Sequence, residues 1–259
     1  MNIKLVKKER CDFRAPLMPL TPAQQNTISK FLREQDLPCL YRKYEWPRRT
    51  YKRDTWEKGF PELFRLEKEI SEAARENSLS RDHLVQIARW GGASRIIDKI
   101  SWPDPTKTKL YVNDKPAEWL ENTPEKAVEI LDSQIYYFGP TYCSKILHFA
   151  LPQIFGALDT RLVQTFGKEA KHYPLLDLEI NRSGWGPSIR ISKSVWPKEY
   201  GTWISVLNSF SQILNQDGIK CPHPQQYEQF GLRANGLWLP ADIETALFSY
   251  TYQELGGAC

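Results

Sequence analysis

The chain has 259 residues, of which 41% are hydrophobic and 25% are charged, and its formal net charge is +4. This apolar content is sufficient for a real hydrophobic core, which excludes a chain too polar to fold. The mild basic excess is compatible with binding to DNA but does not require it.

Cysteine usage and the N-terminal residues bear on where the protein works. The five cysteines, at positions 11, 39, 143, 221 and 259, are odd in number and widely spaced, which favours reduced thiols over a disulfide framework. The first ten residues, MNIKLVKKER, lack the apolar core of a signal peptide, and no segment approaches the length of a membrane span. We therefore expect a cytoplasmic protein without a membrane partner, and we expect a monomer.

Apolar periodicity and helix-start residues predict a mostly helical chain. The predicted helices start near Thr21, Pro61, Ser80 and Thr123, a loop covers 102–113, and two last helices cover 200–214 and 240–252. Gly91-Gly92 stops the helix that Ser80 starts. The segment 168–197 is the least regular, and the alternation of Ile189, Ile191 and Val195 predicts a small strand or hairpin there.

The segment 41–53 combines positive charge with aromatic rings and has no helical period, which predicts a loop. Cations can contact phosphates, and aromatic rings can stack on bases or fill a gap left in a duplex. The alternative is a solvated basic loop whose aromatic residues pack on the body of the protein. The expected DNA contacts are Arg42, Lys43, Arg48, Arg49, Lys52 and Arg53, with Tyr44, Trp46 and Tyr51 as candidate wedges.

A helical hairpin is predicted between Thr123 and Pro152. Gly139 interrupts the helical pattern because only glycine enters unusual backbone dihedrals cheaply, and Pro140 can start a second helix. The unpaired N–H groups at the start of that helix favour an anion, and Lys145 adds a charge about one turn inside. The alternative is an ordinary hairpin within a helical core.

Asp159 stands at the head of a third helical pattern and is the only carboxylate between Ser133 and Lys168. Breaking an N-glycosidic bond develops positive charge on the sugar, which a nearby carboxylate stabilises while it orients or deprotonates a water. The alternative role is an N-cap, with Leu162 and Val163 on the buried face of its helix. Both roles can hold together.

These residues resemble the helix-hairpin-helix superfamily of DNA glycosylases. Gly139 matches the second hairpin glycine, Cys143 matches a small residue, and Asp159 follows Gly139 by twenty positions in the stretch Leu158–Val163. The likeness extends more weakly to oxoguanine-glycosylase-like bacterial proteins and to phage-defence glycosylases. The resemblance implies that Asp159 is the catalytic residue of an enzyme that flips out and excises a modified base.

Two departures from the family pattern affect the expected chemistry. Thr141 occupies the position of the catalytic lysine in bifunctional members, and threonine cannot form a Schiff base. Only one hairpin glycine is kept, and Phe138 replaces a small residue. We therefore expect a monofunctional glycosylase, with a glycosylase/lyase that uses Lys145, or a catalytically inactive DNA-binding module, as alternatives.

The resemblance implies an all-α, two-lobed helix-hairpin-helix glycosylase fold within 1–259, with a small β-hairpin in 168–197. The hairpin lobe would cover about 80–167, and the second lobe 1–79 with 168–259. The partner would be double-stranded DNA carrying an oxidised purine or a hypermodified, glucosylated cytosine. The implied DNA-backbone contacts are Gly139, Thr141, Tyr142, Lys145 and Arg161, and the base pocket or wedge would draw on Tyr136, Tyr137, Trp90, Tyr44, Trp46 and Tyr51.

No cofactor or metal is expected. The four-cysteine cluster of the iron–sulfur glycosylases is missing, and Cys221 and His223 have no second ligand pair in the sequence.

Overall fold

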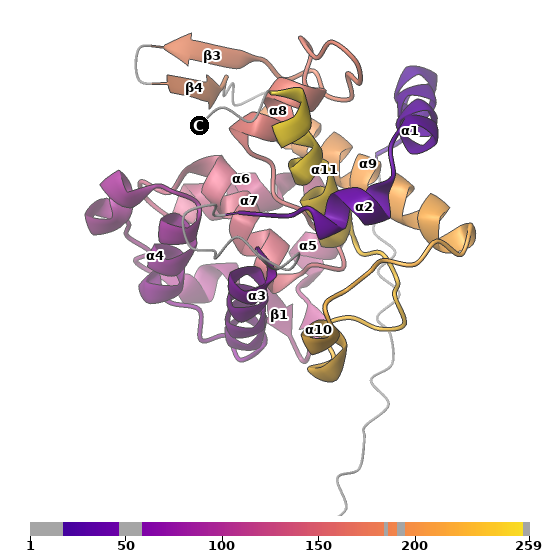
Figure 1. Ribbon diagram of the computed structural model, residues 1–259. Coiled ribbons are helices and arrows are strands. Elements are labelled where there is room, and N and C mark those ends of the chain that lie inside the picture. The colour runs from indigo at the N-terminus through magenta and orange to yellow at the C-terminus, as the bar shows by residue number, and fades with distance from the viewer. Residues whose placement is uncertain (1–17, 47–58, 184–185, 191–194, 256–259) are drawn as a thin grey trace, which may run out of the picture.

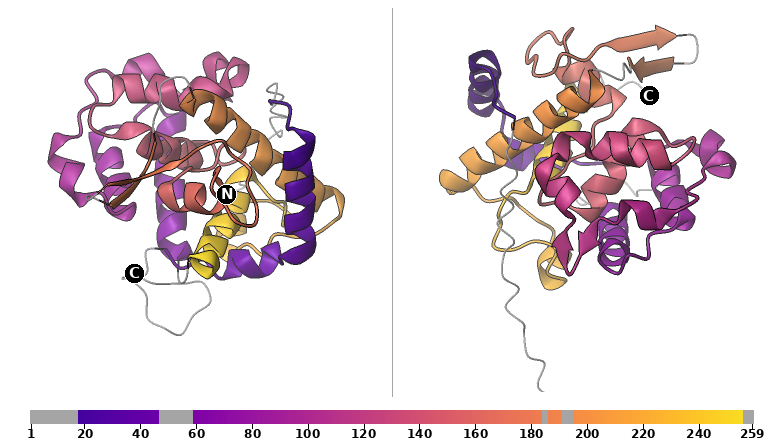
Figure 2. Two further views of the ribbon diagram at one scale, coloured as in Figure 1. Left: turned by 90° about the horizontal axis from the view of Figure 1, so that it is seen from above. Right: turned by 180° about the vertical axis from the view of Figure 1, so that it is seen from behind.

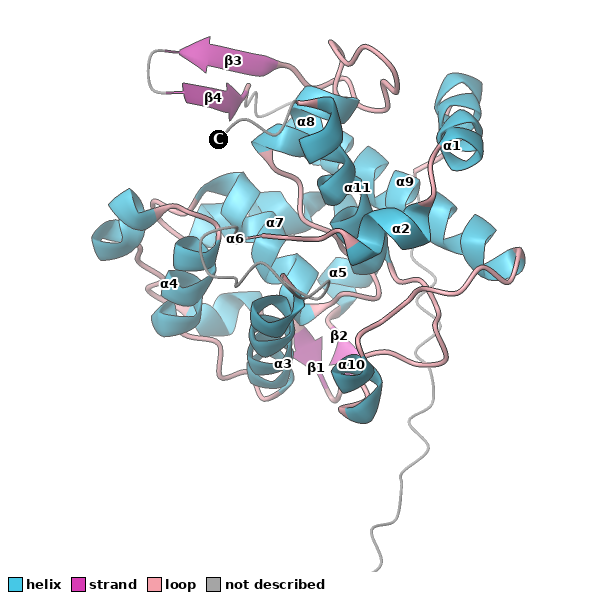
Figure 3. Cartoon of the chain, in the orientation of Figure 1, coloured by secondary structure: helices cyan, strands magenta, loops and turns pink. Residues whose placement is uncertain are grey.

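The computed structural model describes residues 18–46, 59–183, 186–190 and 195–255, and these form a mostly helical protein (Figures 1 and 3). The α-helices are α1 (Pro22–Glu34), α2 (Leu37–Arg42), α3 (Phe60–Arg75), α4 (Arg81–Trp90), α5 (Glu118–Asn122), α6 (Ala127–Gln134), α7 (Gly139–Ala150), α8 (Thr160–Phe166), α9 (Trp196–Gln216), α10 (Gln225–Gln229) and α11 (Pro240–Glu254). Short 3-10 helices are η2 (Ser94–Lys99), η3 (Pro105–Thr108) and η4 (Pro124–Lys126). The all-α class is confirmed at this level.

Two small antiparallel sheets lie at opposite ends of the view in Figure 3, and each has two strands. Strands β3 (Ile180–Ser183) and β4 (Gly186–Ile189) confirm the hairpin expected in 168–197. Strands β1 (Tyr111–Val112) and β2 (Lys115–Pro116) were not predicted, and Tyr111–Val112 lies in the expected loop. Asn113 and Asp114 turn this second hairpin with positive φ angles, which their side chains tolerate better than most.

Side-chain caps explain why several helices start where the sequence predicts. Thr21 and Gln24 form a capping box at α1, with Gln24 N donating to Thr21 Oγ1 over 3.2 Å. Ser80 precedes α4, and its N–H donates to His83 Nδ1 over 3.0 Å. Gly91 ends α4 as expected.

The helices form two groups, one around α7 and one around α11. Helix α7 packs against α3, α4 and α6 on one side, whereas α11 packs against α2, α8 and α9 (Figures 1 and 2). Because α3 packs on α7, Phe60–Arg75 lies with the hairpin helices rather than with the rest of 1–79. The division into the two lobes named above remains a prediction.

The prediction of a loop over 41–53 is wrong at its start, because Leu37–Arg42 is helical. Asp36 caps α2 by accepting from Cys39 N over 2.9 Å, and Leu40 and Tyr41 are buried. The aromatic residues that suggested a loop are partly the buried face of this short helix. Among the described residues, no helix is both long and apolar enough to cross a membrane.

A buried ionic network joins α3 to α11 through Arg233, from the segment between α10 and α11. The Arg233 guanidinium donates to both carboxylate oxygens of Glu67, and its Nε donates to Asp242 Oδ1 over 2.8 Å. Asp242 also accepts from Leu239 N over 2.9 Å and lies 3.1 Å from His223 Nε2. Burial raises the pKa of Asp242, but Arg233 and His223 outweigh this effect and lower it to about 2.

Replacing Arg233 with Met should destabilise the protein by about 3–5 kcal/mol, because it leaves two buried carboxylates without their cation. Chemical denaturation of the variant and the wild type measures the difference. Arg190→Met is the matched control, because Arg190 forms an exposed ion pair with Glu179 and its loss should change stability little. Equal effects of the two substitutions would contradict the role given to Arg233.

Candidate active site

The turn between α6 and α7 is rigid at its base and open at its tip. Tyr136 pairs with Ser101 through two backbone hydrogen bonds, Tyr136 N to Ser101 O over 2.8 Å and Ser101 N to Tyr136 O over 3.3 Å. Tyr137 and Gly139 then adopt positive φ angles of 62° and 76°. A Cβ built on Gly139 would meet no atom within 4 Å, so the immediate surroundings of this residue are open among the described residues.

Helix α7 starts without a side-chain hydrogen bond to its first turn, with Pro140 near its N-terminus. Gly139 was expected to end the first helix, but that helix already ends at Gln134 and Gly139 is the first residue of α7. Because no described side chain caps this 12-residue helix, its N-terminal N–H groups remain available to an acceptor.

Asp159 uses its two carboxylate oxygens differently. As the N-cap of α8, it accepts from Arg161 N over 3.0 Å and Leu162 N over 3.1 Å, both at Oδ1. Its Oδ2 lies 3.8 Å from Lys145 Nζ. The two side chains are 18% and 7% exposed, so the pair lies just below the surface. The N-cap role is confirmed, and one oxygen remains directed toward a cation.

The loop before Asp159 is fixed by three helices. Leu158 N donates to Ser144 Oγ of α7 over 3.0 Å, and Trp203 Nε1 of α9 donates to Ala157 O over 2.9 Å. Ala241 N of α11 donates to Pro152 O over 3.2 Å. Since these partners come from separate elements, Asp159 is held in position before any ligand arrives.

Lys145 lies between a carboxylate and two aromatic rings. Its Nζ is 4.9 Å from the centroid of the Trp90 ring and 5.8 Å from that of Tyr142. The Tyr142 hydroxyl donates to Gly91 O over 2.9 Å, and burial, followed by the charge of Asp159, raises the pKa of Tyr142 to about 12. Lys145 was expected on the DNA backbone, but the structure places it at Asp159 and buries it.

The candidate pocket aromatics divide into buried and exposed residues. Trp90 is buried, and its Nε1 has no acceptor among the described residues. Trp46 is half-buried and donates from Nε1 to Trp90 O over 2.9 Å, so it lines the same region. Tyr136 and Tyr137 are exposed at the hairpin and do not line an enclosed pocket.

Tyr44 does not serve as a wedge in this structure. It is buried and packs against Phe60 and Phe248, with ring centroids 5.5 Å and 6.1 Å away. Tyr44 follows α2 in a turn closed by the hydrogen bond from Tyr44 N to Tyr41 O over 3.1 Å, and the basic, aromatic composition of the segment did not indicate that its ring is buried. Tyr51, Arg48, Arg49, Lys52 and Arg53 lie outside the described residues.

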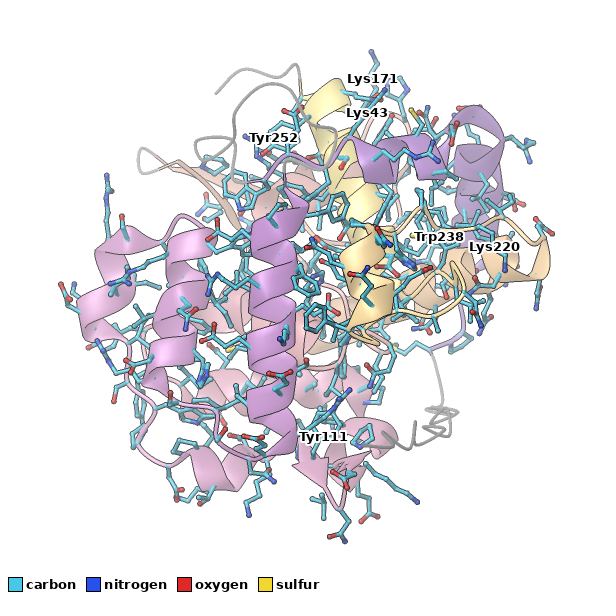
Figure 4. The ribbon with its side chains drawn as sticks, turned by 60° about the horizontal axis from the view of Figure 1, so that its bottom comes forward. Lys43, Tyr111, Lys171, Lys220, Trp238 and Tyr252 are labelled. Atoms are coloured by element: carbon cyan, nitrogen blue, oxygen red, sulfur yellow. The ribbon has the colours of Figure 1, made fainter. Side chains whose placement is uncertain are left out.

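The remaining predicted contacts lie at the ends of α2 and α8, near the C-terminal end of α11, and in the first turn of α7. The Arg161 guanidinium is 4.5 Å from the Tyr252 ring centroid. Tyr252 lies near the C-terminal end of α11, which packs against α2, and Lys43 follows α2 (Figure 4). Arg42 and Lys43 are exposed, as a phosphate contact requires, and Thr141 is half-buried in the first turn of α7.

A buried pair that the sequence did not indicate lies one turn beyond Lys145. His148 Nδ1 of α7 lies 3.2 Å from Glu244 Oε2 of α11, and both side chains are buried. Lys145 and His148 are three positions apart on one helix, which places them on the same face. That spacing is the only feature of the sequence that connects His148 with Lys145, because Glu244 comes from a distant segment.

Two other features are separate from the Lys145–Asp159 pair. A pocket of about 600 Å³ is lined by residues of α3, α4 and η2, including Arg65, Arg81 and Asp98, and its lining contains neither Lys145 nor Asp159. Among the described residues, Cys221, His223 and Asp242 have ligand atoms within 4.8 Å of one another. We assign this group to folding rather than to a metal, because both Asp242 oxygens accept from the Arg233 cation.

No protein-family model matches the chain, and neither a curated protein nor a solved structure matches it.

Replacing Ser144 with Ala should loosen the loop that carries Asp159, because the buried N–H of Leu158 loses its acceptor. We expect a loss of about 1–3 kcal/mol in unfolding free energy and faster amide hydrogen exchange at 157–160. Ser249→Ala is the control, because the Ser249 hydroxyl only donates to Thr245 O within α11. Unchanged exchange at 157–160 would show that Ser144 does not position the loop.

Proposed function

We propose that this protein is a monofunctional DNA N-glycosylase with Asp159 as its catalytic residue. The observation that carries the proposal is that the two carboxylate oxygens of Asp159 have different partners. Oδ1 accepts the hydrogen bonds that cap α8, and Oδ2 faces the buried ammonium group of Lys145. The uncapped start of α7 would bind a phosphate of the DNA strand that carries the extruded nucleotide. The resemblance of the hairpin and the aspartate to the helix-hairpin-helix glycosylases supports the same function.

The chemistry requires no cofactor. As the N-glycosidic bond of an extruded nucleotide breaks, positive charge develops on the sugar and the negative charge of Asp159 Oδ2 stabilises it. The same oxygen can orient a water toward C1′, and the products are the free base and an abasic site. The Oδ1 hydrogen bonds keep the carboxylate in place while Oδ2 exchanges Lys145 for the sugar.

The substrate is proposed as double-stranded DNA with a modified base, either an oxidised purine or a hypermodified cytosine such as the glucosylated cytosine of phage DNA. Trp90 lies beside Lys145, and Trp46 donates to Trp90 O; we propose that an extruded base packs against these aromatic residues.

Asp159→Asn should lower base release by about 100-fold or more, because it removes the charge that stabilises the sugar cation. Asparagine is also a good N-cap, so α8 and the thermal stability should be kept. The assay treats duplexes with oxidised, alkylated or hypermodified phage-type bases with alkali and measures strand breaks. Asp36→Asn, at the N-cap of α2, is the control and should leave the activity unchanged. Retained activity in Asp159→Asn would remove Asp159 from the mechanism.

A glycosylase/lyase is the second candidate, because the amine of Lys145 lies 3.8 Å from Asp159 Oδ2. In that reaction the neutral amine would attack C1′, the base would leave, and a Schiff base would form that borohydride reduces to a stable amine. For a monofunctional enzyme we expect base release without such a covalent adduct. An adduct that disappears in Lys145→Gln but persists in Lys168→Gln, at an exposed lysine, would establish the lyase instead.

Duplex binding without base release from any member of the panel would leave a third candidate, a DNA-binding module without chemistry.

A further inference from the structure

We propose that Tyr136 and Tyr137 form an aromatic contact that stacks on the DNA strand beside the nucleotide at Asp159. This inference rests on the proposed function, since it assigns part of the DNA surface of the same site. In this role the two tyrosines lie outside the base pocket and contact the DNA strand that faces the hairpin.

Both side chains are exposed in a protein whose large aromatic residues are mostly buried. Tyr136 is 54% exposed and Tyr137 is 69% exposed, so neither contributes much to the core. Their backbone is nevertheless fixed, because the pairing of Tyr136 with Ser101 holds the base of the turn. The two rings are therefore presented to solvent from a rigid support.

Tyr137 also occupies an unfavourable backbone conformation. Its φ of 62° lies in the left-handed region, which glycine enters freely and which is disfavoured for a bulky side chain. A glycine at this position would form the same turn without that strain. Since the tyrosine side chain gives little packing in return, folding alone does not explain its presence.

The position of the pair relative to Asp159 fits a neighbouring nucleotide. Lys145, which contacts Asp159, is six residues beyond Gly139, so the start of α7 lies roughly 9 Å from it along the helix axis. One strand of a duplex rises about 3.4 Å per nucleotide along the duplex axis, so the turn lies within about three nucleotides of the one at Asp159. A Cβ on Gly139 or Gly92 would meet nothing within 4 Å, so no described atom blocks a close approach to the backbone at either glycine.

Exposed charged residues near the turn carry both signs, with Arg95, Asp98 and Lys99 on η2 and Asp132 on α6. Nucleic acid is the occupant that the aromatic pair and the phosphate site proposed at the start of α7 favour. Aromatic rings stack on bases of any sequence, and extrusion of one nucleotide exposes the face of its neighbour. We therefore assign the pair to the base face exposed beside the extruded nucleotide.

The test uses the full chain and fluorescence anisotropy with two probes, an intact duplex and a duplex carrying one abasic-site analogue. The wild type should bind the abasic duplex more tightly than the intact one. Tyr137→Gly and Tyr136→Ser should each weaken binding to the abasic duplex by about tenfold. The melting temperature of Tyr137→Gly should stay unchanged or rise, because the strain is relieved.

Phe230→Ser is the matched control, because Phe230 is also exposed, at 57%, but follows α10. It should leave DNA binding unchanged. Tyr137→Asn is the second variant, because asparagine also tolerates a positive φ. Weaker binding with preserved melting temperature in both variants supports the inference, whereas a marked fall in melting temperature in both would make Tyr137 a structural residue and overturn it.

The outcomes separate this inference from the proposed function. If the wild type binds DNA and releases a base while the tyrosine variants bind as tightly as the wild type, only the stacking role is wrong and the pair is left for a protein partner. If the wild type binds neither duplex, the proposed function fails as well.

Discussion

The buried guanidinium of Arg233 is the interaction on which the arrangement of the helices depends. It binds Glu67 of α3 and Asp242 of α11, two helices that flank α7 and α8 and therefore both sides of the candidate site. A buried charge is tolerated only when its partners satisfy it, and here both carboxylates are also buried. The network thus fixes which surfaces of α3 and α11 face inward, and the apolar residues around them fill the remaining space.

The candidate site uses the same principle on a smaller scale and closer to solvent. Lys145 and Asp159 come from different elements, and the aromatic rings of Trp90 and Tyr142 shield their pair from water. Arg233 is enclosed and bonded on all sides, whereas the Lys145–Asp159 pair is longer and partly exposed. A pair of this kind can exchange one partner for a ligand, which the Arg233 network cannot do without exposing charge in the core.

The sequence was most informative where a local rule applied. Thr21 and Asp159 start helices because their side chains accept from nearby N–H groups, and the N–H of Ser80 donates to the His83 ring at the start of α4; such signals are contained within four residues. The pairing of Lys145 with Asp159 depends instead on how the intervening loop folds back, and its bonds come from α9 and α11. Tyr44 illustrates the opposite case, since its basic neighbours suggested an exposed loop, whereas the turn that follows α2 places its ring in the core. Glu67, Arg233 and Asp242 carry no common motif, so only the folded chain could connect them.

Packing alone explains why the residue three positions before Asp159, Gly156, is a glycine. A Cβ at this position would approach Leu207 Cδ1 to 2.5 Å and Glu244 Cβ to 2.8 Å, so even alanine would push the loop away from α9 and α11. The φ of Gly156 is not in the left-handed region, so lack of room is the reason for glycine here. Among sequences that share this fold, an invariant glycine three residues before the aspartate would thus result from close packing of the loop against α9 and α11 rather than from contact with a substrate.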